Sequence, residues 1–341
     1  MPSETQIDAQ LIAAAKMEGE LNTIALQHDW CSYGELIKGF KSKYGLQVNE
    51  LNPKGGSEAQ IEAVTSAAGN AAQTPDVIDV SFAFSRQLMD EGLVQPYKVS
   101  VWDSIPAEIK DPAGYWYAGY YSVMTFEVNR EAVKNIPQDW PDLLSPDYKG
   151  AVALGGDPLG SVQAQMSVYL AALANGGSLD HPQPGLEFFK QLNEAGNFVP
   201  FRATQETIAR GQTPIVPRWS VSSLGDKKAL AGNPHIEIVI PASGTIANVN
   251  IQAIPANAPH PNAARLWMEF LYSDEGQLYR LKGNCLPARY NDLAARNAVP
   301  VNLAPALPQM NRIIFPTAEQ ILNAQREISN DWMKIVGVDV K

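Results

Sequence analysis

The chain has 341 residues, of which 45% are hydrophobic and 18% charged, and its formal net charge is −10. This composition is typical of a globular chain, and the length predicts two lobes instead of one core. Because phosphate binding needs a basic face, the negative charge argues against nucleic acid as a partner, and it disfavours anionic membrane surfaces as well. The longest apolar runs fall short of the roughly 20 residues that a membrane span needs.

Two features of the sequence bear on the compartment of the protein. The N-terminal stretch "MPSETQIDAQ" has neither a basic region nor an apolar core, so we expect no signal peptide in this chain. Either the protein is cytoplasmic, or an initiator methionine replaces its signal. Cys31 and Cys285 are the only cysteines, and their separation does not match a metal site. The pattern favours two unrelated small apolar side chains, although an oxidising compartment would allow one disulfide.

The first hundred residues alternate between helical and strand patterns. Ser57 followed by Gln60 predicts a capping box at the start of one helix. Apolar spacing predicts helices over residues 6–19, 32–45 and 57–64, and strands over residues 21–26, 46–51 and 75–82. Strands that alternate with helices imply parallel pairing, right-handed crossovers and an α/β architecture.

The remainder of the chain continues this alternation. An aromatic and β-branched run predicts an extended strand over residues 115–128. The sequence then predicts a strand over 150–154, a helix over 161–177, a helix over 184–196, strands over 213–220, 235–241 and 245–255, and one long helix over 261–283. Because no internal repeat or long linker separates these elements, we expect two interleaved lobes.

The loops that follow the predicted strands are the expected ligand positions. Open α/β sheets bind ligands beyond the carboxyl ends of their strands. In the first lobe these loops cover residues 27–32, 52–57 and 81–85, and in the second lobe the turn "GDPLGS" leads into a helix. For His28, in the first of these loops, a functional and a structural role are about equally expected.

Two helix starts could bind an anion. The stretches Gly55-Gly56-Ser57 and Gly160-Ser161 can each present backbone N–H groups and the positive end of a helix dipole to a negative charge. The alternative is that both serines only cap their helices. Two such loops in facing lobes favour binding.

Other side chains near these loops extend the candidate site. Arg218 and Trp219 could grip a carboxylate or phosphate and supply an aromatic wall, and a surface arginine beside a core tryptophan is the alternative. Asp157 would either hold a ligand amine or cap its own turn. The aromatic residues of the run over 115–128 belong mostly in the core, and Tyr121 is our candidate for one that faces the ligand.

Catalytic signatures are absent from the sequence. It contains no nucleophile elbow, no zinc-protease motif, no phosphate-binding P-loop and no dinucleotide-binding glycine pattern. None of the four histidines lies at metal-ligand spacing from another. We therefore expect a protein that is not an enzyme and that has no catalytic residue, metal or cofactor.

Several motifs together resemble a known family. The stretches "AAAKMEGELNTIAL", "PDVIDVSF", "DEGLVQPY", "PQDWPDLLSPDYKG", "GDPLGS" and "HPNAARLWMEFLYSDEGQ", followed by "LPARY", are similar in order and spacing to bacterial extracellular solute-binding proteins of ABC importers. The branch that they resemble holds ferric-iron, thiamine, phosphonate and sugar-phosphate binders. The element Trp-x-Asp-Leu-Leu-x-Pro-x-Tyr-Lys-Gly is specific to that branch. The resemblance extends from about Ile12 to Arg289.

This resemblance implies a two-lobed periplasmic-binding-protein fold of type II, with solute in a cleft between two α/β lobes and a hinge that closes over it. The chain would cross between the lobes in strands over residues 120–128 and 245–254, and the helix from Asn262 would return to the first lobe. The lobes would comprise residues 1–122 with 248–280, and residues 123–247 with 281–341. The resemblance also implies a periplasmic monomer whose partners are a small-molecule solute and the membrane permease of an ABC importer.

Departures from the branch bear on the solute. Its iron binders use two adjacent tyrosines near the position of Arg218-Trp219, because Fe(III) needs anionic oxygen ligands. His28 lies close to where some of them place a histidine, but the tyrosine pair is absent. A small organic anion or zwitterion, such as a phosphonate, a phosphorylated metabolite or a carboxylated sugar-amine conjugate, fits better. The alternatives are a ferric-iron-binding protein and, with less support, a cleft hydrolase or transferase. The predicted ligand contacts are His28, Asp29, Trp30, Gly55, Gly56, Ser57, Ser81, Phe82, Tyr121, Asp157, Gly160, Ser161, Arg218, Trp219 and Asn248.

Overall fold

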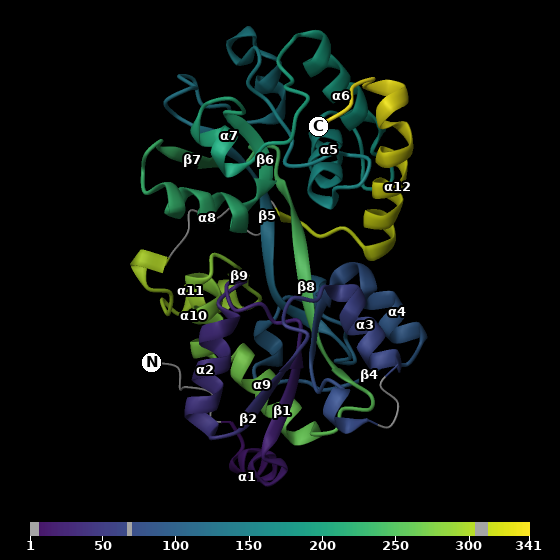
Figure 1. The fold of residues 1–341 in the computed structure, drawn as a ribbon, viewed down its shortest axis with the longest axis vertical. Helices are drawn as coiled ribbons and strands as arrows, with labels where there is room; N and C mark the ends of the chain where they lie inside the picture. Colours follow the sequence, from purple (N-terminus) through teal and green to yellow (C-terminus); the bar gives the residue numbers. More distant parts are fainter. Residues whose placement is uncertain (1–6, 67–69, 304–312) are drawn as a thin grey trace. The chain divides into compact units, whose positions relative to one another are not determined.

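The computed structural model describes residues 7–66, 70–303 and 313–341. The chain divides into two compact α/β units, and each is built from two separate segments (Figure 1). Unit 1 comprises Met1–Tyr121 and Val249–Pro305, and unit 2 comprises Ser122–Asn248 and Ala306–Lys341. The segment 281–303, which the sequence analysis assigned to the second lobe, therefore belongs to unit 1. Two connections explain this assignment. Cys285 forms a disulfide with Cys31, and the strand Leu286–Pro287, which follows Cys285, pairs with Tyr120 and Tyr121.

Unit 1 begins with the predicted alternation of helices and strands. Gly19 and Gly45 end the first two helices with φ of +82° and +75°, a left-handed conformation that glycine adopts without strain. The elements of this segment are α1 (Ala9–Glu18), β1 (Glu20–Ile24), α2 (Tyr33–Tyr44), β2 (Gln47–Leu51), α3 (Ser57–Ser66), β3 (Ile78–Ser81), α4 (Ser85–Asp90) and β4 (Val94–Gln95). Strands β1 and β2 pair in parallel, as the alternation predicts.

The second segment of unit 1 holds α9 (Pro261–Tyr272), α10 (Asp274–Lys282), β9 (Leu286–Pro287) and α11 (Tyr290–Ala295). The prediction of one long helix over 261–283 is wrong, because the backbone leaves the helical region at Ser273, where ψ is 161°. The Ser273 hydroxyl accepts a hydrogen bond from the Gly276 N–H at 3.1 Å and so caps α10. Helix α9 does return to unit 1, as expected, and its Trp267 packs edge-on against Phe40 of α2, with ring centroids 5.1 Å apart.

Two long strands, β5 (Tyr117–Asn129) and β8 (Thr245–Pro255), contain the boundaries between the units. In unit 1, β3 and β4 pair antiparallel with β8. In unit 2, β6 (Ile215–Trp219) and β7 (Ile236–Val239) pair antiparallel with β5, and β10 (Ile313–Ile314) pairs in parallel with β8. These are the two segments that the sequence analysis expected to connect the lobes.

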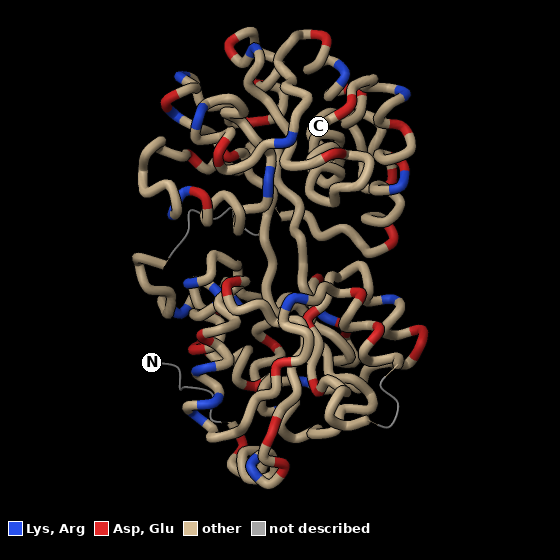
Figure 2. The backbone as a smooth tube through the Cα atoms, in the orientation of Figure 1, with Lys and Arg blue, Asp and Glu red and all other residues tan. Residues whose placement is uncertain are grey.

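Unit 2 is packed around a large aromatic core. Trp140, from the motif that carries the family resemblance, is fully buried and lies edge-on to Phe126, with centroids 4.9 Å apart. The helices of this unit are α5 (Val162–Ala174), α6 (Gln183–Glu194), α7 (Gln205–Ala209), α8 (Ser220–Leu230) and α12 (Ala318–Ile335). Figure 2 shows acidic and basic residues interspersed over each unit. Within the described residues, no helix is long and apolar enough to span a membrane.

The strand predicted over residues 150–154 is reduced to an isolated bridge. Val152 pairs in parallel with Phe198 and Ile215. The N–H groups of Ala151 and Val152 both donate to the carbonyl of Asn197, at 3.1 and 2.9 Å. Because two consecutive N–H groups share one acceptor, the alternation of a regular strand is lost.

Candidate functional site

The loops that follow β1, β2 and β3 are connected by side-chain contacts within unit 1. His28 Nε2, in the loop after β1, lies 2.5 Å from Glu50 Oε2 near the end of β2. The hydroxyl of Ser57 accepts a hydrogen bond at 3.0 Å from the Ser81 N–H at the end of β3. Asp29 is exposed in the same loop as His28. Two separate contacts therefore join the loop after β1 to β2 and the start of α3 to the end of β3.

The predicted capping box at Ser57 and Gln60 does not form. Ser57 is the first residue of α3 and its hydroxyl is occupied by Ser81. The Gln60 amide donates to the Asp79 carbonyl at 2.6 Å and accepts from the Asp79 N–H at 2.8 Å, as a neighbouring strand would. Both side chains thus fix β3 and its loop. At Gly55 a Cβ would lie 2.7 Å from the Asn52 amide nitrogen, so this glycine permits a tight turn before α3.

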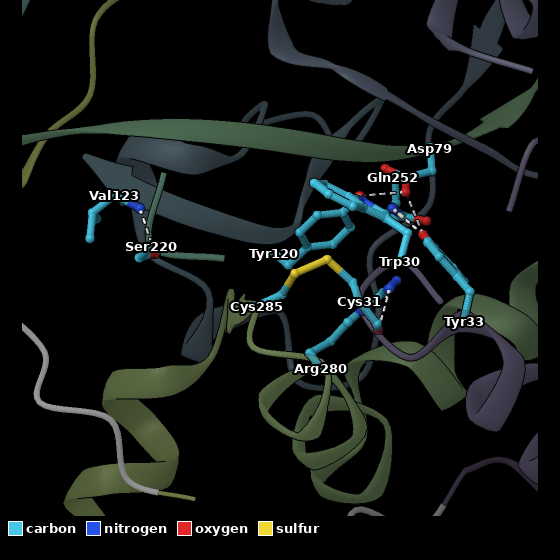
Figure 3. The surroundings of a disulfide bond; sticks show 10 residues. All are labelled: Trp30, Cys31, Tyr33, Asp79, Tyr120, Val123, Ser220, Gln252, Arg280 and Cys285. Atoms are coloured by element: carbon cyan, nitrogen blue, oxygen red, sulfur yellow. Dashed lines mark hydrogen bonds between the residues drawn. A yellow bond between two sulfur atoms is a disulfide. The ribbon is translucent and has the colours of Figure 1, made fainter. Parts of the chain in front are cut away.

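Trp30, in the same loop as His28 and Asp29, is exposed, with 40% of its surface accessible. Its indole nitrogen donates to the Tyr120 hydroxyl at 2.7 Å, and that hydroxyl donates to Asp79 Oδ2 at 2.9 Å (Figure 3). Tyr33 donates to the same carboxylate oxygen at 2.6 Å and accepts from the Gln252 amide at 3.2 Å. An exposed indole is therefore connected to a buried polar network, and the sequence analysis did not find the buried members.

The guanidinium of Arg280 packs against two aromatic rings of this network. This guanidinium is fully buried and lies 4.0 Å from the Tyr33 ring centroid and 4.6 Å from that of Tyr120. Burial raises the pKa of Asp79, and the nearby Arg280 charge opposes that shift. Burial also raises the pKa values of Tyr33 and Tyr120. Both phenols are accordingly protonated at neutral pH and act as hydrogen-bond donors.

The two cysteines form a disulfide, so the expectation of two unrelated apolar side chains is wrong. Cys31 and Cys285 have their Cα atoms 5.4 Å apart. Sequence spacing could not reveal this, because 254 residues separate them. Cys31 and Ser32 also have φ of +47° and +58°, a left-handed conformation that costs non-glycine residues roughly 1–2 kcal/mol each. The bond therefore joins a strained loop to the segment before β9.

Three further predicted contacts are placed as follows. Phe82 packs against Trp116, with ring centroids 5.2 Å apart. Tyr121 is 1% exposed, as buried as Tyr120, so exposure does not single it out among the aromatic residues of β5. Asn248 is half-buried in β8.

In unit 2 the turn before α5 uses its own backbone donors. The N–H groups of Gly160 and Ser161 both donate to the Asp157 carbonyl, at 3.1 and 2.7 Å, so these two groups are not free for an anion. Ser161 caps α5 by accepting from the Ala164 N–H at 3.4 Å, and Asp157 Oδ1 accepts from the Leu159 N–H at 3.0 Å. In this structure Asp157 caps its own turn and Ser161 caps α5, which are the alternatives to ligand binding that the sequence analysis gave for these residues. The remaining N–H groups of the first helical turn still carry the positive end of the α5 dipole.

Arg218 lies between two acidic side chains. Its Nη1 is 2.5 Å from Asp226 Oδ2 and 3.3 Å from Glu127 Oε2, and only 15% of the Arg218 side chain is accessible. Burial raises the pKa of Glu127 to about 8. Neither sequence alternative, a solute-binding cation or a surface arginine, anticipated this ion-pair cluster. Trp219 belongs to the core of unit 2. Within the described residues, no three His, Cys, Asp or Glu side chains are grouped to hold a metal ion.

The sequence of the chain matches a known family of solute-binding proteins. The family model for bacterial extracellular solute-binding proteins matches residues 72–323, and the chain belongs to that family. An uncharacterised protein of Haemophilus influenzae is 27% identical over 287 residues, which cover 79% of both chains. "Iron uptake protein A1" of a Synechocystis strain is 21% identical over 287 residues, 81% of this chain and 78% of that protein.

A solved structure supports the same assignment of the fold. It is the periplasmic binding protein AfuA of Actinobacillus pleuropneumoniae, with exogenous fructose-6-phosphate bound. Its TM-score is 0.66 at 23% sequence identity, and the match covers 94% of this chain and 99% of that one. The chain accordingly has the periplasmic-binding-protein fold and is a solute-binding protein of an ABC importer, a family that works with a small-molecule solute and a membrane permease.

Proposed function

We propose that this solute-binding protein captures a small organic zwitterion or anion. The observation that carries the proposal is Trp30. Its indole ring is exposed while its only polar group, the N–H, is occupied by Tyr120. A flat ring of this kind packs against the apolar face of a sugar or attracts a protonated amine, but it supplies no lone pair that could coordinate a metal ion.

The charges of the candidate residues favour a zwitterion over a simple anion. Asp226 and Glu127 occupy the Arg218 guanidinium, so a solute acid group would have to compete with these two acidic side chains for it. We assign the acid group of the solute to the first turn of α5, where the helix dipole favours negative charge. Asp29 in unit 1 is exposed beside Trp30 and suits an amine. A carboxylated or phosphorylated sugar-amine conjugate combines these features.

Ferric iron is the second candidate, because one relative is named an iron uptake protein. The chemistry of unit 1 argues against it. Fe(III) prefers anionic oxygen ligands, but Tyr33 and Tyr120 are protonated donors to Asp79. A tyrosinate-iron complex absorbs visible light, so we expect protein loaded with ferric citrate to stay colourless. A visible absorption band after loading would favour iron instead.

Solute binding should stabilise the folded protein. A ligand at a hundred times its Kd adds about 2.7 kcal/mol to the free energy of unfolding. We expect thermal unfolding in the presence of fructose 6-phosphate or glucosamine 6-phosphate to shift upward, and ferric citrate to have no effect. A shift with ferric citrate alone would contradict the proposal. Turnover of either sugar phosphate would instead support the enzyme alternative.

A further inference from the structure

We propose that Tyr120, Asp79 and the Cys31–Cys285 disulfide are positioning elements for Trp30, which hold the indole in one orientation before solute arrives. The inference rests on the proposed function, in which Trp30 contacts the solute. It assigns a role to buried groups that do not themselves touch the solute.

The first anchor acts on the ring edge of Trp30. Its indole N–H donates to the Tyr120 hydroxyl at 2.7 Å, and that hydroxyl donates in turn to Asp79 Oδ2 at 2.9 Å (Figure 3). A second donor, Tyr33, fixes the same Asp79 oxygen at 2.6 Å. Because a tryptophan side chain turns about two torsions, a hydrogen bond at its far edge selects one rotamer.

The second anchor acts on the backbone next to Trp30. Cys31 is covalently bonded to Cys285, and its carbonyl accepts from Arg280 Nη1 at 3.3 Å. A Cβ at Gly283 would lie 2.5 Å from the backbone carbon of Cys31. Because Gly283 has no side chain, the backbone segments around Gly283 and Cys31 can approach closely. The left-handed φ values of Cys31 and Ser32 persist only where the surroundings hold them, and such residues gather at ligand-binding sites.

Core packing does not explain these anchors. A side chain that keeps 40% of its surface exposed gains less from burial than a core tryptophan does. Even so, Trp30 has a buried hydrogen-bond partner and a disulfide at the next residue. A ring that is both exposed and fixed meets a solute without losing conformational entropy, which is how pre-organisation raises affinity.

The test uses the full chain with its seven tryptophans replaced by 5-fluorotryptophan. The ¹⁹F resonance of Trp30 is identified by its loss in Trp30→Phe. We expect this resonance to shift and broaden in Tyr120→Phe and in the Cys31→Ser/Cys285→Ser double variant, while the resonances of the unit 2 core tryptophans stay in place. The double variant reports independently if Tyr120→Phe fails to fold.

Tyr169→Phe is the matched control, because it also removes a buried tyrosine hydroxyl, which donates to the Leu179 carbonyl at 2.6 Å. It should leave the Trp30 resonance unchanged. An unchanged Trp30 resonance in both Tyr120→Phe and the cysteine double variant would overturn the inference. So would an equal response in Tyr169→Phe.

A titration with fructose 6-phosphate separates this inference from the proposed function. If the parent protein binds this probe, we expect Tyr120→Phe to bind it about tenfold more weakly, equivalent to about 1.4 kcal/mol, and Tyr169→Phe to match the parent. Equal affinity in Tyr120→Phe would overturn the inference. If the parent does not bind the probe, the result counts against the proposed solute class, and the ¹⁹F spectra alone decide whether Trp30 is positioned as proposed.

Discussion

Arg218, Glu127 and Asp226 show how burial changes the chemistry of single residues. Glu127 is fully buried on β5, and burial raises its pKa to about 8. At neutral pH this carboxyl is therefore mostly protonated, and Asp226 supplies the main negative charge beside Arg218. Removing Arg218 would leave Glu127 and Asp226 without a neighbouring cation. We therefore infer that the main role of this arginine is to stabilise unit 2.

The raised pKa of Glu127 predicts a pH dependence of stability. The folded-state pKa, about 8, exceeds the ordinary value of about 4.3. The protonated group therefore contributes stability that is fully present below about pH 4.3 and is lost as the pH rises through 8. We expect the free energy of unfolding to fall more steeply from pH 5 to pH 9 in the parent than in Glu127→Gln, which cannot ionise. Denaturant titrations at several pH values measure this, and parallel curves for the two proteins would contradict it.

At the scale of elements, the turn before α5 depends on close contacts between its glycines and the helix start. A Cβ on Gly156 would collide with the Ser161 hydroxyl, which caps the helix. A Cβ on Gly160 would have no neighbouring atom within 4 Å. A methyl group would therefore disturb the Ser161 cap at Gly156 but no neighbouring atom at Gly160. The sequence analysis singled out only Gly160.

We predict that Gly156→Ala lowers the free energy of unfolding by about 1 kcal/mol or more, because it displaces the Ser161 cap. Gly160→Ala is the matched control and should leave stability nearly unchanged. Chemical denaturation of both variants measures the difference. Equal effects at the two positions would show that the Ser161 contact does not matter.

The helices and strands also show which parts of the structure can be predicted from sequence patterns. Helices with clear apolar spacing and terminal glycines, such as α1 and α2, could be predicted because their signals are local. The capping box at Ser57 failed because β3, which is distant in sequence, offers better partners for both of its side chains. The Trp30–Tyr120–Asp79 network and the disulfide could not be predicted for the same reason: each joins residues that only the tertiary structure brings together.

At the scale of the whole molecule, the chain passes between its two units within β5 and β8. We propose that these strands contain the hinge of the protein. A solute that contacts both units favours the state in which all contacts are made, so binding should select a closed form. Small-angle scattering should then give a smaller radius of gyration with bound solute than without it. An unchanged radius at saturating solute would argue against hinge closure.

The central claim, that Trp30 helps to bind an organic solute, is tested most directly by native mass spectrometry of protein purified without refolding. We predict that the parent retains a small organic molecule and that Trp30→Ala loses it. Met333→Ala, which removes another exposed apolar side chain, should retain it. A bound mass equal to iron, or an organic molecule that Trp30→Ala retains as fully as the parent, would contradict the account.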